Sequence, residues 1–188
     1  MTLKALLLEK KSAVTKKWLN KICSEYPVDT SQFLRGQKDR FLNPVGHTFE
    51  EVIDGLFDQL VSDTPDSEAC LVLLNDIIRI KAVQEFSPLQ ALSFIFLLKE
   101  VLYKELGKQI TQQHLFDELR SIESNIDRMA LNAFNIYMKC REHIYEIRVN
   151  ELKTLTSRFL RRANLTRDPG GMEPEIGSDA QLTQKIKG

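Results

Sequence analysis

The chain has 188 residues, of which 43% are hydrophobic and 28% are charged, and its 26 basic side chains balance 26 acidic ones. This length predicts one domain with a tail, and the composition excludes a chain that is disordered throughout. Because the formal net charge is zero, no overall field attracts the chain to nucleic acid or to an anionic membrane, and we expect neither as a partner.

Other global features indicate a cytoplasmic protein with reduced thiols. The three cysteines, Cys23, Cys70 and Cys140, show no C-x-x-C spacing, which disfavours a disulfide framework and a zinc site. The longest apolar stretch, residues 91–98, is much shorter than the roughly 18 residues of a membrane span. Charged residues end the short apolar run 6–8 and no cleavage site follows, so we expect no signal peptide.

Hydrophobic residues recur at helical spacing along most of the chain, and glycine and proline are rare before residue 163. We therefore predict an all-α bundle of about five long helices. The first amphipathic helix spans residues 3–26 and ends at Pro27. Residues 29–43 allow only a short helix.

Polar caps mark the starts of the next two helices. Asn43 and Pro44 begin a helix that we expect to reach about residue 61. Asp66 or Ser67 caps the following helix, which we expect to reach about residue 86.

The last two predicted helices are the most apolar and the longest. Ser87 and Pro88 start a helix to about residue 106, which we place at the centre of the bundle because it is apolar nearly all round. Gly107 then ends this helix, and Thr111 caps the last one.

The last helix, from about residue 111, has apolar or small residues in alternating steps of four and three. We expect this helix to be about 50 residues long. The rhythm stutters between Ile147 and Leu152. We expect a homodimer through this helix. The stripe assigned to the dimer includes Ile122, Ile126, Met129, Ile136 and Ile147. We assign residues 1–162 to one helical domain and residues 163–188, which lack periodicity, to a disordered tail.

The sequence offers no set of residues with the pattern of a catalytic or metal site. Nucleophile elbows, glycine-rich phosphate loops and H-E-x-x-H motifs are missing, and His47, His114 and His143 lack the spacing of a helical metal pair. We therefore expect no enzyme activity, no metal and no cofactor. Haem on His114 or His143 is a weaker alternative, because one histidine in an apolar helical pocket suffices.

Arg79 lies in an otherwise apolar stretch with Lys81, Asp76 and Glu85 nearby in sequence. We interpret Arg79 as a paired, partly buried charge that holds two helices in register, with an anion contact to a ligand as the alternative.

Two further groups have a structural and a functional interpretation. Phe94 and Leu98 belong to a stripe that we interpret as core, although a ligand pocket would use the same residue types. Basic residues gather near the end of the last helix, where they suit the helix dipole better than nucleic acid, because only one aromatic residue is near. These residues are Lys153, Arg158, Arg161, Arg162 and Arg167.

Two strings, N-P-V-G-H at 43–47 and R-I-K-A-V-Q-E-F-S-P at 79–88, resemble the RsbRD-type N-terminal domain of bacterial co-antagonists of the RsbT kinase. The likeness covers about residues 5–150. It implies a helical sensory or regulatory module, often joined to a STAS output domain, and related sensor domains are globin-like without haem. Here no STAS domain follows, and we expect a stand-alone module.

The resemblance also implies roles for single residues. Asn43, Pro44, Gly46 and His47 belong to a turn that fixes a helix start, with Gly46 allowing close packing. The resemblance further implies that the interior or a pocket wall is shaped by Arg79, Gln84 and Phe86.

Two functions of different classes follow from these observations. The first is a non-enzymatic sensory or regulatory module that acts in bacterial signalling through a protein partner, such as a STAS-domain protein or a kinase. The second is a structural or accessory subunit of a larger redox or energy complex. A haem-binding globin-like sensor is a third, weaker hypothesis.

Overall fold

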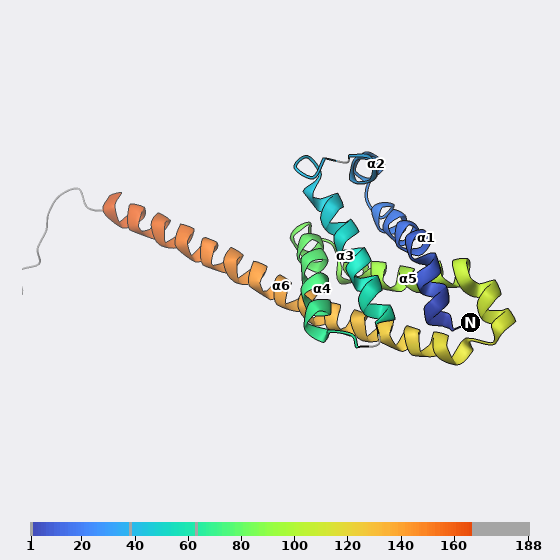
Figure 1. Ribbon diagram of the computed structural model, residues 1–188. Coiled ribbons are helices and arrows are strands. Elements are labelled where there is room, and N and C mark those ends of the chain that lie inside the picture. Colours follow the sequence, from blue (N-terminus) through green and yellow to red (C-terminus); the bar gives the residue numbers. More distant parts are fainter. Residues whose placement is uncertain (1, 38, 63, 167–188) are drawn as a thin grey trace, which may run out of the picture. The chain divides into compact units, whose positions relative to one another are not determined.

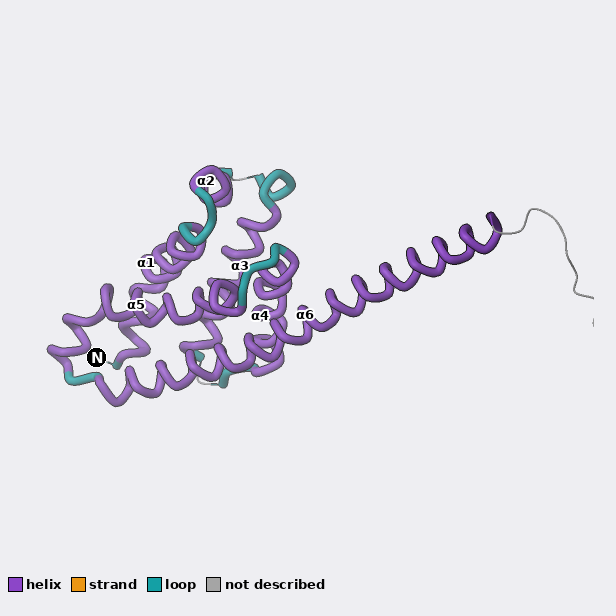
Figure 2. Tube along the Cα trace, turned by 180° about the vertical axis from the view of Figure 1, so that it is seen from behind, coloured by secondary structure: helices purple, strands orange, loops and turns teal. Residues whose placement is uncertain are grey.

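The computed structural model describes residues 2–37, 39–62 and 64–166, and in these ranges it contains six α-helices and no strand (Figures 1 and 2). The predicted all-α bundle with a long C-terminal helix is confirmed. The helices are α1 (Leu3–Cys23), α2 (Val28–Gly36), α3 (Pro44–Val61), α4 (Ser67–Val83), α5 (Pro88–Gln113) and α6 (Phe116–Thr166).

The chain divides into two units, Met1–Glu146 and Ile147–Gly188. The first unit holds the bundle, in which α1 packs against α3 and α5 while α3 packs against α4 (Figure 1). The described part of the second unit is the C-terminal part of α6. Within the described residues, no helix combines the length and the apolar character that crossing a bilayer requires.

The core is built from one apolar face of each long helix, and α5 supplies its centre. Phe94 and Leu98 on α5 are almost fully buried. Trp18 on α1 is also buried, stacks on the Phe94 ring with centroids 6.4 Å apart, and donates its indole N–H to the Phe94 carbonyl at 2.6 Å. This bond satisfies the polar atom of the largest core side chain.

The sequence predicted the bounds of α3 correctly, whereas the boundary between α5 and α6 differs from the prediction. α5 continues through Gly107 and Thr111 because its core face extends to Ile110, which is buried. The reversal occurs at His114, whose left-handed conformation (φ 54°) lets the Leu115 N–H donate to the Ile110 carbonyl at 3.1 Å.

The predicted dimer stripe on α6 is divided by the fold. Ile126 and Met129 are buried in the core of their own bundle, and Ile122 and Ile136 pack partly against it, whereas Ile147 is exposed. In this conformation the first part of the stripe is therefore occupied by the bundle itself. The predicted tail begins with residues 163–166, which are still helical in α6, and its remainder lies outside the described residues.

Candidate functional site

A buried lysine lies where the end of α1 meets α4 and the start of α5. The Lys81 side chain is 0% exposed, and its Nζ donates to the Glu25 carboxylate at 2.8 Å and to the Gln90 carbonyl at 3.2 Å. The Ser93 hydroxyl donates to the other carboxylate oxygen of Glu25. An unpaired ammonium in an apolar core is very costly, so Glu25 is what allows Lys81 to be charged there.

Three aromatic rings complete the surroundings of the ammonium. The Lys81 Nζ lies 4.9 Å from the ring centroid of Phe86, 5.7 Å from that of Tyr26 and 5.8 Å from that of Phe94. Ring faces attract cations, which favours the charged form. Burial lowers the pKa of Lys81 below its ordinary value, and the hydrogen bond with Glu25 offsets part of this shift.

The turn between α4 and α5 follows directly from Lys81. Glu85 adopts the left-handed conformation with φ 62°, which costs a residue other than glycine about 1–2 kcal/mol. The Phe86 N–H donates to the Lys81 carbonyl at 3.2 Å and closes the turn. We call Glu25 together with residues 81–87 the junction.

α6 contacts the backbone of the junction directly. The Tyr137 hydroxyl donates to the Phe86 carbonyl at 2.7 Å, and the Arg141 guanidinium donates to the Ala82 carbonyl at 3.4 Å. Tyr137 is only 4% exposed, so its hydroxyl has little access to water as an alternative partner. The junction therefore links α1, α4, α5 and α6.

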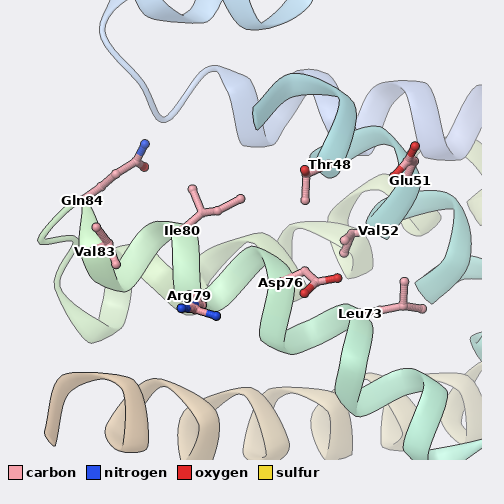
Figure 3. Close-up of a pocket in the computed structure, with 9 residues that line it drawn as sticks. All are labelled: Thr48, Glu51, Val52, Leu73, Asp76, Arg79, Ile80, Val83 and Gln84. Carbon is pink, nitrogen blue, oxygen red and sulfur yellow. The ribbon is translucent and has the colours of Figure 1, made fainter. Parts of the chain in front are cut away.

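A groove of about 560 Å³ lies between α3 and α4 beside the junction (Figure 3). Val52, Leu73, Ile80 and Val83 give it an apolar lining, and Gln84 stands at its junction end. Polar groups also line it, namely those of Thr48, Glu51, Asp76 and Arg79.

Gln84 belongs to both the junction and the groove lining. Besides lining the groove, its Oε1 accepts a hydrogen bond from the Tyr26 hydroxyl at 2.9 Å. Burial raises the pKa of the Tyr26 phenol, which therefore remains a donor at neutral pH. A ligand that contacts Gln84 would thus act on Tyr26, whose ring lies near the Lys81 ammonium.

A comparison with protein families matches residues 12–152 to the RsbT co-antagonist protein rsbRD N-terminal domain. The chain belongs to this family. The matched range of the RsbRD N-terminal domain includes the groove, the junction and α6 up to residue 152. No curated protein and no solved structure matches the chain. The family is a regulatory signalling family and not a known enzyme family.

The structure corrects the interpretation of Arg79 that the sequence suggested. Arg79 is exposed on the groove side and is not the partly buried charge that the sequence suggested, because the paired buried charge is Lys81. The spacing could have revealed this. Lys81 follows Ile77 and Ile78 by four and three residues and therefore lies on the buried face of α4, whereas Arg79 does not. Glu25 has no comparable sequence signal, because only the fold brings it to Lys81.

The residues predicted to form a pocket or core lie in three places. Arg79 and Gln84 line the groove, and Phe86 is half-buried in the junction. Phe94 and Leu98 lie in the core, 0% and 1% exposed. Phe86 and Phe94 come together around Lys81, while Leu98 lies one helical turn beyond Phe94 on α5.

The N-P-V-G-H turn of the RsbRD N-terminal domain is built around Asn43. Its Oδ1 accepts from the Gly46 N–H at 2.9 Å, and its Nδ2 donates to the carbonyls of Leu34 and Gln37 at 3.0 and 3.1 Å. A Cβ at position 46 would lie 2.3 Å from the Asn43 amide nitrogen, so a larger residue there would displace the Asn43 side chain from its capping position. Pro44 occupies the first turn of α3.

The histidines do not support the haem hypothesis. His114 is exposed at the C-cap of α5, and His143 is exposed on α6 with its Nδ1 3.8 Å from the Glu146 carboxylate. Neither side chain points into an apolar cavity, which an axial haem ligand requires. His47, at the start of α3, lies 3.8 Å from Glu50.

Proposed function

We propose that this domain is a non-enzymatic sensory or regulatory module that acts through protein–protein interaction in bacterial signalling. The observation that carries the proposal is the junction, in which one buried ion pair and one turn connect four helices. A rearrangement at this point changes the hydrogen-bond acceptors that α6 contacts. α6 in turn carries exposed apolar residues that are available to a partner.

In the proposed mechanism the groove receives the signal and the junction transmits it. An occupant of the groove competes with Tyr26 for the Gln84 side chain and so shifts the packing around Lys81. One hydrogen bond contributes about 0.5–1.5 kcal/mol, and 1.4 kcal/mol changes a two-state ratio about tenfold. One altered contact is therefore sufficient to change the ratio between two conformations of α6.

The output in this proposal is the binding of a protein partner, with a STAS-domain protein or a kinase as the expected class. The domain itself acts as a homodimer through α6. Residues 147–163 have exposed side chains throughout, and this stretch offers contact surface along its whole length.

The test is purification of the tagged protein from its native host, with mass spectrometry of the recovered partners. Wild type is compared with Tyr137→Phe, which removes the hydroxyl that α6 donates to the junction. Tyr103→Phe is the matched control, because Tyr103 also links α5 to α6, donating to Glu123 at 3.0 Å, yet it is exposed and not part of the junction.

We expect wild type to recover STAS-domain proteins or kinases. Tyr137→Phe should change the amount recovered by about fivefold, equivalent to about 1 kcal/mol, and Tyr103→Phe should leave it unchanged. Stoichiometric recovery of one redox or energy complex, equal for both variants, would instead identify an accessory subunit and overturn the proposal.

A further inference from the structure

α6 carries a second apolar seam in addition to the face that packs on the bundle. Five apolar residues follow one another at seven-residue steps, and each is at least 40% exposed. They are Leu131, Met138, Tyr145, Leu152 and Phe159. Phe134 and Leu155, three residues after the first and fourth of these, are also exposed and share the seam.

The second seam is distinct from the bundle face. Ala133 is fully buried against the bundle, and it follows Leu131 by two residues, or about 200° around the helix. Leu131 therefore lies on the side of α6 opposite Ala133, away from the core. Apolar residues repeated every seven positions are the pattern of a helix that packs along a second helix.

The charges along α6 indicate which second helix packs on this seam and in which direction it runs. Residues 142–151 hold three carboxylates, Glu142, Glu146 and Glu151, against one arginine, Arg148. Residues 153–162 hold four basic residues and no acidic one. Residues 142–151 are therefore net acidic and residues 153–162 are basic, which makes the stretch 142–162 complementary to a copy of itself that runs in the opposite direction.

A parallel copy would place like charges together. In register, the basic stretch 153–162 would face its own equivalent, and Arg148, three residues after Tyr145 in the seam, would face Arg148 of the second copy. Like charges on facing positions oppose association. The antiparallel direction instead sets residues 142–151 of one copy against 153–162 of the other.

We infer that the second seam binds α6 of a second copy of this chain in an antiparallel pair centred near Leu152. The inference rests on the proposed homodimer and adds its surface and its direction. The complementary overlap runs over residues 142–162, which is about 30 Å of helix or about three heptads.

The experiment measures distances between spin labels in the full chain by electron paramagnetic resonance. Single cysteines replace Thr154 or Leu160 in a Cys140→Ser background, and Cys23 and Cys70 stay unlabelled because they are buried. In the antiparallel pair, equivalent labels are separated along the axis by about 6 Å at position 154 and about 24 Å at position 160. We expect the second distance to be clearly longer than the first.

Equal short distances at both positions would mean a parallel dimer, which overturns the inference and leaves the proposed homodimer intact. No dipolar coupling at either position, together with a monomer in sedimentation, would overturn both. Leu152→Glu should abolish coupling in the antiparallel pair, whereas Asn150→Glu, outside the seam, should keep it. Circular dichroism of both variants verifies that the bundle stays folded.

Discussion

At the residue scale, Lys81 and Glu25 are not equivalent members of their ion pair. Lys81 has no access to solvent, whereas the Glu25 side chain is 21% exposed and also accepts from Ser93. Removal of either charge leaves the other, but only Lys81 is left without access to solvent, with the Gln90 carbonyl as its remaining polar partner. The stability of the bundle should therefore depend more on the carboxylate than on the ammonium.

We predict that Glu25→Gln lowers the free energy of unfolding by about 3 kcal/mol, because it leaves a buried unpaired ammonium. Lys81→Met should cost about 1 kcal/mol or less, because methionine fills the ring-lined space and water reaches Glu25. Urea unfolding followed by circular dichroism measures both values. The reverse order of the two costs would show that Lys81 is not charged in the folded state.

The three thiols should also differ in reactivity. Burial raises the pKa of Cys23, Cys70 and Cys140, but Cys140 is only partly buried. With an aromatic disulfide reagent near neutral pH, we expect Cys140 to react first and the other two to react only as the chain unfolds. A raised pKa means that the thiolate fraction, and hence the rate at Cys140, increases as the pH rises above neutral. Fast reaction of two thiols in the native state would contradict the burial.

At the element scale, most helices were predictable because caps and hydrophobic spacing are local signals. The start of α3 at Pro44 and its end at Val61 are both as predicted. The end of α5 was not predictable from Gly107, because the packing of Ile110 in the core outweighs the helix-breaking tendency of one glycine. The site was less predictable, since the partner of Lys81 comes from 56 residues away.

The stutter after Ile147 also has a structural explanation. The rhythm read from the sequence follows the bundle face of α6 through Ile136, which packs partly against the core, whereas Ile147 is exposed. Leu152 and Phe159 belong instead to the seven-residue series that starts at Leu131. Two seams on one helix therefore looked like one interrupted seam.

Gly46 in α3 and Gly107 in α5 provide a matched pair of substitutions. Gly46→Ala should destabilise the domain by about 1–2 kcal/mol, because the new Cβ meets the Asn43 side chain and displaces the cap. Gly107→Ala should stabilise it by about 0.5–1 kcal/mol, because nothing lies within 4 Å and alanine favours the helix interior. Thermal unfolding of both variants gives the two signs, and a loss of stability from Gly107→Ala would contradict the uninterrupted α5.

At the scale of the whole molecule, the formal net charge of zero conceals a separation of charge along α6. Overall composition gave no reason to expect a nucleic-acid partner, but it could not show where opposite charges lie. In a chain without net charge, local complementarity is not masked by general repulsion. Raising the salt concentration should therefore weaken the association between copies.

We predict that raising the salt concentration from about 0.05 M to about 0.5 M weakens the homodimer by about threefold or more. Salt screens the attraction between the acidic and basic stretches of α6, and the screening length falls below about 10 Å above 0.1 M. Sedimentation equilibrium measures the dissociation constant. Tighter association at high salt would indicate that like charges face one another, as they do in a parallel pair.

The position of Trp18 gives the molecule a built-in optical reporter. It is the single tryptophan of the chain, and its indole stacks on Phe94, whose ring also faces the Lys81 ammonium. Indole emission depends on nearby charge and on the hydrogen bond of the ring nitrogen, here donated to the Phe94 carbonyl. Changes in the intensity or wavelength of intrinsic fluorescence should thus follow events at the ion pair in real time, without any label, and allow libraries of small molecules to be screened directly on the unmodified protein.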